Sequence, residues 1–269
     1  MEPASPRQSD ILRMARELGR VGVDDLATHF DVTPQTIRKD LNDLCDGGPL
    51  QRVHGGAIYP SGATNYAYEA RRRLAADGKR RIGERTASLI PNNSSIMLNI
   101  GTTTEQVALA LGRHDGIMVV TNNINVANIL RGSPTAEVII AGGLVRPSDG
   151  GIVGEATVDF IRQFKVDFAV IGASAIDEEG AILDYDLREV RVAQEIMRHA
   201  RHTILVSDHM KFERNAPVRI GHISEIDIFV TDAEPPKRVM DMCRQSDVVI
   251  EIAEDKIDGE GTADMERVA

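Results

Sequence analysis

Three consecutive threonines follow a glycine near the middle of the chain, and their types and spacing suit the binding of a phosphate group. Residues 97–100, mostly apolar, are typical of a buried strand, and the apolar positions after Glu105 are typical of a helix. Gly101 permits a tight turn between the two, so free N–H groups and hydroxyls would face a dianion at the positive end of the helix dipole. The alternative is that residues 102–104 only cap the helix.

Polar residues also follow other predicted strands, at residues 121–123, 141–143 and 172–174. In open parallel sheets ligands bind outside the carboxyl ends of the strands, so these loops would converge on one crevice. Lys211 could reach a phosphate, whereas Asp186 and Glu189 could accept hydrogen bonds from hydroxyl groups; the alternative for each is a surface charge. The predicted ligand-binding residues are Asn99, Gly101, Thr102, Thr103, Thr104, Asn122, Asn123, Gly143, Ser174, Asp186, Glu189 and Lys211.

A second group of residues suits contact with a DNA major groove. Thr33 followed by Pro34 is a typical helix start, and Ile37, Leu41 and Leu44 share one face of the helix that follows. The opposite face would present amide, hydroxyl and cationic groups to base edges. Two shorter helices are predicted before it, the first closed by Gly19 and the second capped by Asp24. This arrangement is typical of a helix-turn-helix.

The segment after this helix alternates in polarity and turns at two glycines, which indicates a small β-hairpin wing at residues 50–58. Its cationic side chains could reach phosphates or the minor groove. The alternative is that the charged residues are solvated groups on an ordinary three-helix domain. The predicted DNA-binding residues are Thr33, Gln35, Thr36, Arg38, Lys39, Arg52 and His54.

Short β-branched runs alternate with helix-capable segments through the rest of the chain, which favours βα units and a parallel sheet. The predicted strands are residues 95–100, 117–121, 137–141, 167–171, 203–207, 226–231 and 248–252. The predicted fold class is therefore α/β, with an N-terminal winged helix-turn-helix and a C-terminal doubly wound, largely parallel sheet. The predicted divisions are 1–60 for DNA binding, 61–90 for a basic linker and helix, 91–254 for the sensing domain and 255–269 for an acidic tail.

Composition limits the function further. The 269 residues carry a formal net charge of -10, so contact with nucleic acid must be local. Cys45 and Cys243 are isolated, which argues against disulfides and a zinc site, and no metal or cofactor is expected. No apolar run approaches the roughly 18 residues of a membrane span, and the first residues lack a signal-peptide pattern. The expected location is the cytoplasm, with no membrane partner.

The N-terminal motifs resemble those of the DeoR-type bacterial repressors. The likeness lies in the sequences T-I-R-K-D-L, from Thr36 to Leu41, and H-G-G-A, from His54 to Ala57. Lys39 stands where the family more often has arginine, which favours contact with phosphate rather than a bidentate contact with a base. The resemblance implies operator DNA as a partner. A duplex site read by recognition helices requires a symmetric oligomer, so a dimer or tetramer is expected.

The C-terminal motifs also resemble this family, whose sensor fold is similar to ribose-5-phosphate isomerase. Residues 100–103, 119–130, 142–143, 149–157, 189–191 and 211–212 resemble most closely the members that control glycerol 3-phosphate metabolism. That resemblance implies sn-glycerol 3-phosphate as a small effector that relieves DNA binding. Asn99 stands where the family usually carries aspartate, and Ala175 where it often has glycine.

Two alternatives remain at this point. The effector could be another phosphorylated sugar or polyol, or the chain could be an enzyme similar to a sugar-phosphate isomerase. Isomerisation needs a positioned carboxylate base and an electrophilic lysine, for which Asp186, Glu189 and Lys211 are candidates. Their spacing does not place them on one substrate carbon, and a non-enzymatic regulator is expected. The basic segment 71–85 is the predicted transmitter between the two domains.

Overall fold

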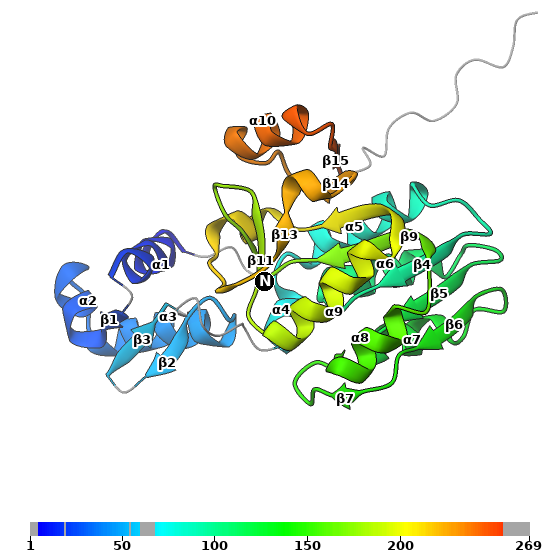
Figure 1. Ribbon diagram of the computed structural model, residues 1–269. Helices are drawn as coiled ribbons and strands as arrows, with labels where there is room; N and C mark the ends of the chain where they lie inside the picture. The colour runs from blue at the N-terminus through cyan, green and yellow to red at the C-terminus, as the bar shows by residue number, and fades with distance from the viewer. Residues whose placement is uncertain (1–4, 19, 54, 60–67, 255–269) are drawn as a thin grey trace, which may run out of the picture.

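The computed structural model describes residues 5–18, 20–53, 55–59 and 68–254. Two groups of elements lie side by side: a small group of helices and short strands from the N-terminal part, and a larger group built on one sheet (Figure 1). The predicted roles of Gly19 and His54 and the predicted tail 255–269 lie outside the described residues.

The N-terminal group contains three helices and a three-stranded antiparallel sheet. Its core is formed by apolar side chains from all three helices, including Ile11, Leu26, Ile37 and Leu41. The buried face of the third helix is therefore the one that the periodicity predicts. The elements are α1 (Pro6–Leu18), β1 (Arg20–Gly22), α2 (Val23–His29), α3 (Pro34–Asp46), β2 (Gln51–Val53) and β3 (Gly56–Ile58).

The prediction that Asp24 caps the second helix is wrong. Helix α2 begins at Val23 with Gly22 as its N-cap, so Asp24 lies inside the first turn, where its charge favours the positive end of the helix. The cause is strand β1, which the sequence analysis did not predict. β1 pairs with β3 and leads directly into α2. A Cβ on Gly56 would lie 2.0 Å from the carbonyl oxygen of Val21, which explains a glycine in the H-G-G-A motif.

The larger group is built on a seven-stranded, entirely parallel sheet in the order β15-β14-β12-β9-β4-β5-β6. Every predicted strand is present, with ends shifted by a few residues. From β4 the chain adds β5 and β6 on one side of this strand, and it then returns to add β9, β12, β14 and β15 on the other side. This is the predicted doubly wound topology. The strands are β4 (Ser95–Leu98), β5 (Met118–Thr121), β6 (Glu137–Ile140), β9 (Val166–Gly172), β12 (Ala200–Val206), β14 (Ile228–Thr231) and β15 (Val249–Ile252).

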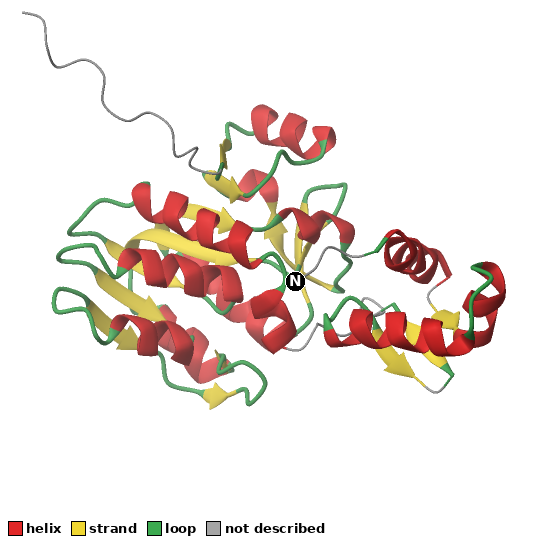
Figure 2. Cartoon of the chain, turned by 180° about the vertical axis from the view of Figure 1, so that it is seen from behind, coloured by secondary structure: helices red, strands yellow, loops and turns green. Residues whose placement is uncertain are grey.

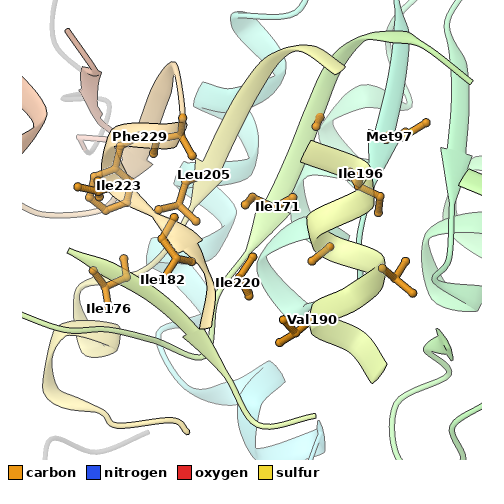
Figure 3. Close-up of a cluster of buried hydrophobic side chains, with 14 of the residues drawn as sticks. Met97, Ile171, Ile176, Ile182, Val190, Ile196, Leu205, Ile220, Ile223 and Phe229 are labelled. Carbon is orange, nitrogen blue, oxygen red and sulfur yellow. The ribbon is translucent and has the colours of Figure 1, made fainter. Parts of the chain in front are cut away.

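Helices cover both faces of this sheet (Figure 2). Side chains alternate along each strand, so Ile96 and Leu98 face one core while Met97 faces the other. Figure 3 shows the second core, where Ile171 of β9 lies toward Ile196 of α9. The first face is covered by α5 (Ala76–Ser88), α6 (Thr102–Leu111) and α7 (Ile124–Leu130), and the second by α8 (Glu155–Ile161) and α9 (Leu187–Arg198).

Further elements surround the sheet. The additional short strands were not predicted from the sequence, whereas the two helices lie where helical segments are expected, in segment 61–90 and between the last two predicted strands. A small sheet in the order β10-β11-β13 and a β7-β8 hairpin extend from its loops. None of the described helices is long and apolar enough to cross a membrane. The elements are α4 (Tyr68–Arg73), β7 (Leu144–Val145), β8 (Ile152–Val153), β10 (Ala175–Ile176), β11 (Ala181–Asp184), η1 (His209–Glu213), β13 (Val218–His222), η2 (Ile223–Glu225) and α10 (Lys237–Gln245).

Candidate effector site and nucleic-acid interface

The carboxyl ends of β4 and β9 meet at the point where the sheet reverses its strand order, which is where open α/β sheets bind ligands. Asn99 follows β4, and its Oδ1 accepts a hydrogen bond from the N–H of Gly172 at 3.0 Å. The two predicted loops are therefore held together by the side chain of Asn99. We call the space beside them the crevice.

Helix α6 begins at this point. Its N-cap, Gly101, has φ +152°, a conformation that side chains disfavour, so the glycine is required by the turn. The Thr104 hydroxyl lies between the carbonyl oxygens of Asn99 (3.0 Å) and Gly101 (2.8 Å) and donates to this backbone. Thr104 thus stabilises the loop, while Thr102 lines an adjoining cavity of about 330 Å³. The side chain of Thr103 is also buried here.

The cavity beside α6 is lined mainly by polar and charged side chains, among them Arg72, Arg73, Lys79 and Glu105. Lys79 is buried on α5, and its Nζ donates to the carbonyl oxygens of Arg71 and Leu74, the latter at 2.6 Å. Burial lowers the pKa of Lys79 to about 8, although its charge is favoured by Asp208 at 3.9 Å.

A second buried ammonium group lies nearby. Lys211 is in η1, which follows β12 and is capped by the Asp208 side chain. Burial lowers the pKa of Lys211 to about 7, with Asp208 opposing this shift and the positive charge of Lys79 adding to it. Asp208 therefore interacts with both lysines. Lys79 lines the cavity at the first turn of α6, and Lys211 shares its neighbour Asp208, so this pair of buried amines is suited to holding an anion.

Arginines and carboxylates form a network on another side of the crevice. Arg146, at the end of the β7 strand, donates to both carboxylate oxygens of Asp149 at 2.8 Å, to Glu189 at 2.6 Å and to Asp186 at 3.2 Å. Arg71 of α4 also donates to Asp149, at 2.9 Å. Burial alone would raise the pKa of Asp149, but the hydrogen bonds and charge of Arg146 and Arg71 outweigh burial and lower it.

The remaining carboxylates of the network differ in their proton affinity. Burial and the neighbouring charge of Asp184 raise the pKa of Glu189 to about 8. Burial also raises the pKa of Asp184, which accepts a hydrogen bond from the Ser174 hydroxyl at 3.1 Å. Asp186 caps α9, and hydrogen bonds from Arg188 lower its pKa to about 2. Asp184 and Glu189 are thus suited to donating hydrogen bonds as well as accepting them.

Three of the predicted residues shape the loops after β5 and β6. Asn123 caps α7 and donates from its side-chain amide to Oε1 of Glu105 at 3.4 Å, which joins it to the cavity beside α6. The Asn122 side chain donates to the carbonyl oxygen of Ile152 at 2.9 Å. Gly143 has φ +152° and lies where a Cβ would be 2.2 Å from the Thr157 hydroxyl, so its glycine is required by packing.

Several residues of the crevice are not predicted from the sequence. Arg71 and Lys79 fall in the predicted transmitting segment, and the sequence predicts no ligand-binding role for Arg146, Asp149, Asp184 or Glu105. Arg71 lies on α4 and Lys79 lies eight residues later on α5. Their spacing in the sequence gives no indication that their side chains are buried. Among the described residues no group of histidine, cysteine or carboxylate side chains could hold a metal ion.

The exposed face of α3 carries the predicted DNA-binding groups. Thr33 caps the helix by accepting a hydrogen bond from the N–H of Thr36 at 3.3 Å, and Gln35, Arg38 and Lys39 are exposed. Thr36 is half-buried, with its hydroxyl 3.0 Å from that of Thr33. These first turns present the short polar and cationic groups that a major groove requires.

Two contacts fix the orientation of this helix. Asp40, buried on α3, accepts a hydrogen bond from Arg7 of α1 at 2.6 Å. On the other side, the exposed Arg52 of the wing donates to the side chain of Asn42. The wing arginine therefore lies against the recognition helix.

Comparison with known proteins agrees with both parts of this description. The family model of the DeoR-like helix-turn-helix domain matches residues 7–63, and that of the DeoR C-terminal sensor domain matches residues 74–233. The chain belongs to the DeoR family. It is a DNA-binding transcriptional regulator with a sensor domain for a small effector.

Similar proteins from this family cover nearly the whole chain. It is 44% identical over 246 residues to the glycerol-3-phosphate regulon repressor of Escherichia coli (strain K12), with 91% of this chain and 98% of that protein covered. The repressor of the same name from Haemophilus influenzae is 44% identical over 231 residues, covering 86% of this chain and 90% of that protein. Such relatives are regulators, so the enzyme alternative is not supported.

Solved structures show a more distant likeness. Ribose 5 phosphate isomerase A from Neisseria gonorrhoeae is 16% identical, with a TM-score of 0.35 over 50% of this chain and 52% of the isomerase. A likeness at this level supports no statement about activity.

Proposed function

We propose that this DeoR-family regulator represses genes of glycerol metabolism and releases its operator when sn-glycerol 3-phosphate binds in the crevice. The observation that carries the proposal is the buried Lys79 in the cavity at the start of α6, with a second buried amine, Lys211, sharing its neighbour Asp208. The names and 44% identity of the two relatives described above support the choice of this ligand among phosphorylated polyols.

The two ends of the ligand would meet different groups. Its dianionic phosphate would bind the N–H groups at the start of α6 and the ammonium of Lys211. Its hydroxyls would exchange hydrogen bonds with carboxyl and amide groups such as Glu189 and Asn99. The proposed site keeps the residues predicted from sequence: Asn99, Gly101, Thr102, Thr103, Thr104, Asn122, Asn123, Gly143, Ser174, Asp186, Glu189 and Lys211.

For the operator, we propose that α3 enters the major groove. Arg38 and Gln35 would contact base edges, while Lys39 would contact phosphate. Two recognition helices are needed to read a two-fold symmetric site, so the regulator would act as a dimer or tetramer in the cytoplasm, where operator DNA is located. The proposed DNA-binding set is Thr33, Gln35, Thr36, Arg38, Lys39, Arg52 and His54, within a DNA-binding domain of residues 1–60.

The remaining proposed divisions are a basic linker and helix at 61–90, the sensing domain at 91–254 and a tail at 255–269. Of the basic segment, Ile82 and Ala87 of α5 are buried against the sheet. That helix would therefore move with the sensing domain and not with the DNA-binding domain.

Thermal unfolding with added ligand tests the effector assignment. A ligand that binds only the folded state raises stability by RT ln(1 + [L]/Kd), so sn-glycerol 3-phosphate should raise the melting temperature more than glycerol or inorganic phosphate does. The double variant Thr102→Val with Thr103→Val should lose this shift and keep operator affinity. If the wild type does not respond to sn-glycerol 3-phosphate but responds to another phosphosugar, the effector assignment is wrong.

A further inference from the structure

Tyr68 connects α4 to the helices that border the crevice. Its hydroxyl donates to Oε2 of Glu105 at 2.8 Å and accepts a hydrogen bond from the side-chain amide of Asn125 at 2.9 Å. The same amide of Asn125 donates to Oε1 of Glu105 at 3.0 Å. Helix α4 is the first described element after the wing strand β3, so Tyr68 is held by the sensor domain at the point where the chain arrives from the DNA-binding domain.

Glu105 is placed to respond to an anion. It is buried in the first turn of α6, and its side chain lines the same cavity as Thr102 and Lys79. A dianion bound at this helix end would repel the Glu105 carboxylate and move it away. This movement weakens the charge-assisted hydrogen bond that the carboxylate accepts from Tyr68.

We propose, on the basis of the effector site proposed above, that Tyr68 is a positioning residue that couples an anion bound at α6 to helix α4. When the crevice is empty, the bond to Glu105 holds α4 in the arrangement that favours operator binding. Anion binding weakens this bond and releases α4. Because of this bond, the effector binds the operator-binding arrangement less tightly than the arrangement in which α4 is released. A ligand shifts a conformational equilibrium only through such a difference in affinity.

The test measures coupling separately from binding. Operator affinity is titrated with and without saturating sn-glycerol 3-phosphate, on a duplex that the wild type has enriched from a random pool. Tyr68→Phe removes only the hydroxyl. Thr135→Val is the control, because it removes a hydroxyl that donates over a similar 2.9 Å to the carbonyl oxygen of His114, within the sensor domain and away from α4. Glu105→Gln is a second variant, which keeps an acceptor for Tyr68 but removes the charge.

The effector weakens operator binding by a certain factor, and we expect Tyr68→Phe and Glu105→Gln each to reduce this factor at least threefold. The affinity of Tyr68→Phe for the effector itself should stay within about threefold of wild type. Thr135→Val should keep the wild-type factor. By reciprocity, saturating operator must change effector affinity by the same reduced factor. The proposal is overturned if Tyr68→Phe retains the wild-type factor or loses effector binding more than tenfold. Absence of any effector response in the wild type would instead refute the proposed function.

Discussion

Raising the pH from 7 to 8 should weaken effector binding, because Lys211 must be protonated to hold a phosphate. In the free protein burial places the pKa of Lys211 at about 7. A dianion beside the ammonium raises this pKa, so binding takes up a proton wherever free Lys211 is partly neutral. If the pKa of Lys211 in the free protein is about 7, its growing neutral fraction raises the Kd of the effector about fivefold between pH 7 and 8. Lys79, with a pKa of about 8, adds a further factor of up to about two.

Isothermal titration calorimetry of sn-glycerol 3-phosphate tests this expectation directly. Two buffers of different ionisation enthalpy at pH 7.5 should report uptake of roughly one proton. The ligand itself contributes little, because a phosphate monoester has its second pKa at about 6. Lys211→Met should bind more weakly and lose most of this pH dependence, leaving the smaller contributions of Lys79 and Glu189, whose pKa values are both about 8. A wild-type Kd constant between pH 7 and 8, or release of protons, would refute the role of Lys211.

Arg38→Ala should weaken binding to the enriched operator by about 1–3 kcal/mol, measured by fluorescence anisotropy, and leave effector affinity unchanged; equal loss of both would indicate a damaged fold. Lys39→Ala should weaken binding to operator and random duplex alike and reduce the salt slope by about one per protomer, so a sequence-dependent loss would contradict a phosphate contact. Arg146→Ala leaves the buried carboxylate of Asp149 with Arg71 as its remaining cation and should lower the free energy of unfolding, measured by urea denaturation, by about 1–3 kcal/mol, because several buried hydrogen-bond acceptors lose their donor; a loss below about 1 kcal/mol would show that the network contributes little.

The main sheet and the recognition helix were predictable because their signals are local. Residues such as Val170 and Ile204 lie in continuous apolar runs, which are required when helices cover both faces of a parallel sheet. On α3 the cap Thr33 and the buried Leu41 lie within one helix, so spacing alone defines its two faces. Where the signal is not local, the prediction failed: β1 is only three residues long, and its partner strand begins at Gly56.

The crevice was predictable only in the part that depends on single loops. Gly101 and the threonines after it lie at a strand-to-helix turn that sequence spacing reveals, whereas the bond between Arg71 and Asp149 joins residues far apart in the chain. Arg146 likewise meets Glu189 only because the β7-β8 hairpin folds over the start of α9. No periodicity in the sequence encodes such a pairing, so these cations could be identified as charged but not as buried.

The burial of these cations distinguishes their roles. The charges of Arg146 and Arg71 are balanced by carboxylates such as Asp149, with which both form hydrogen bonds. The buried amines of Lys79 and Lys211 both lie close to Asp208, and burial lowers the pKa of each. A buried cation is costly unless it is paired, and these two amines share the carboxylate of Asp208. A dianion at the N-terminus of α6 would add negative charge near them. The arginines would then maintain the shape of the crevice, while the lysines would provide affinity for the phosphate.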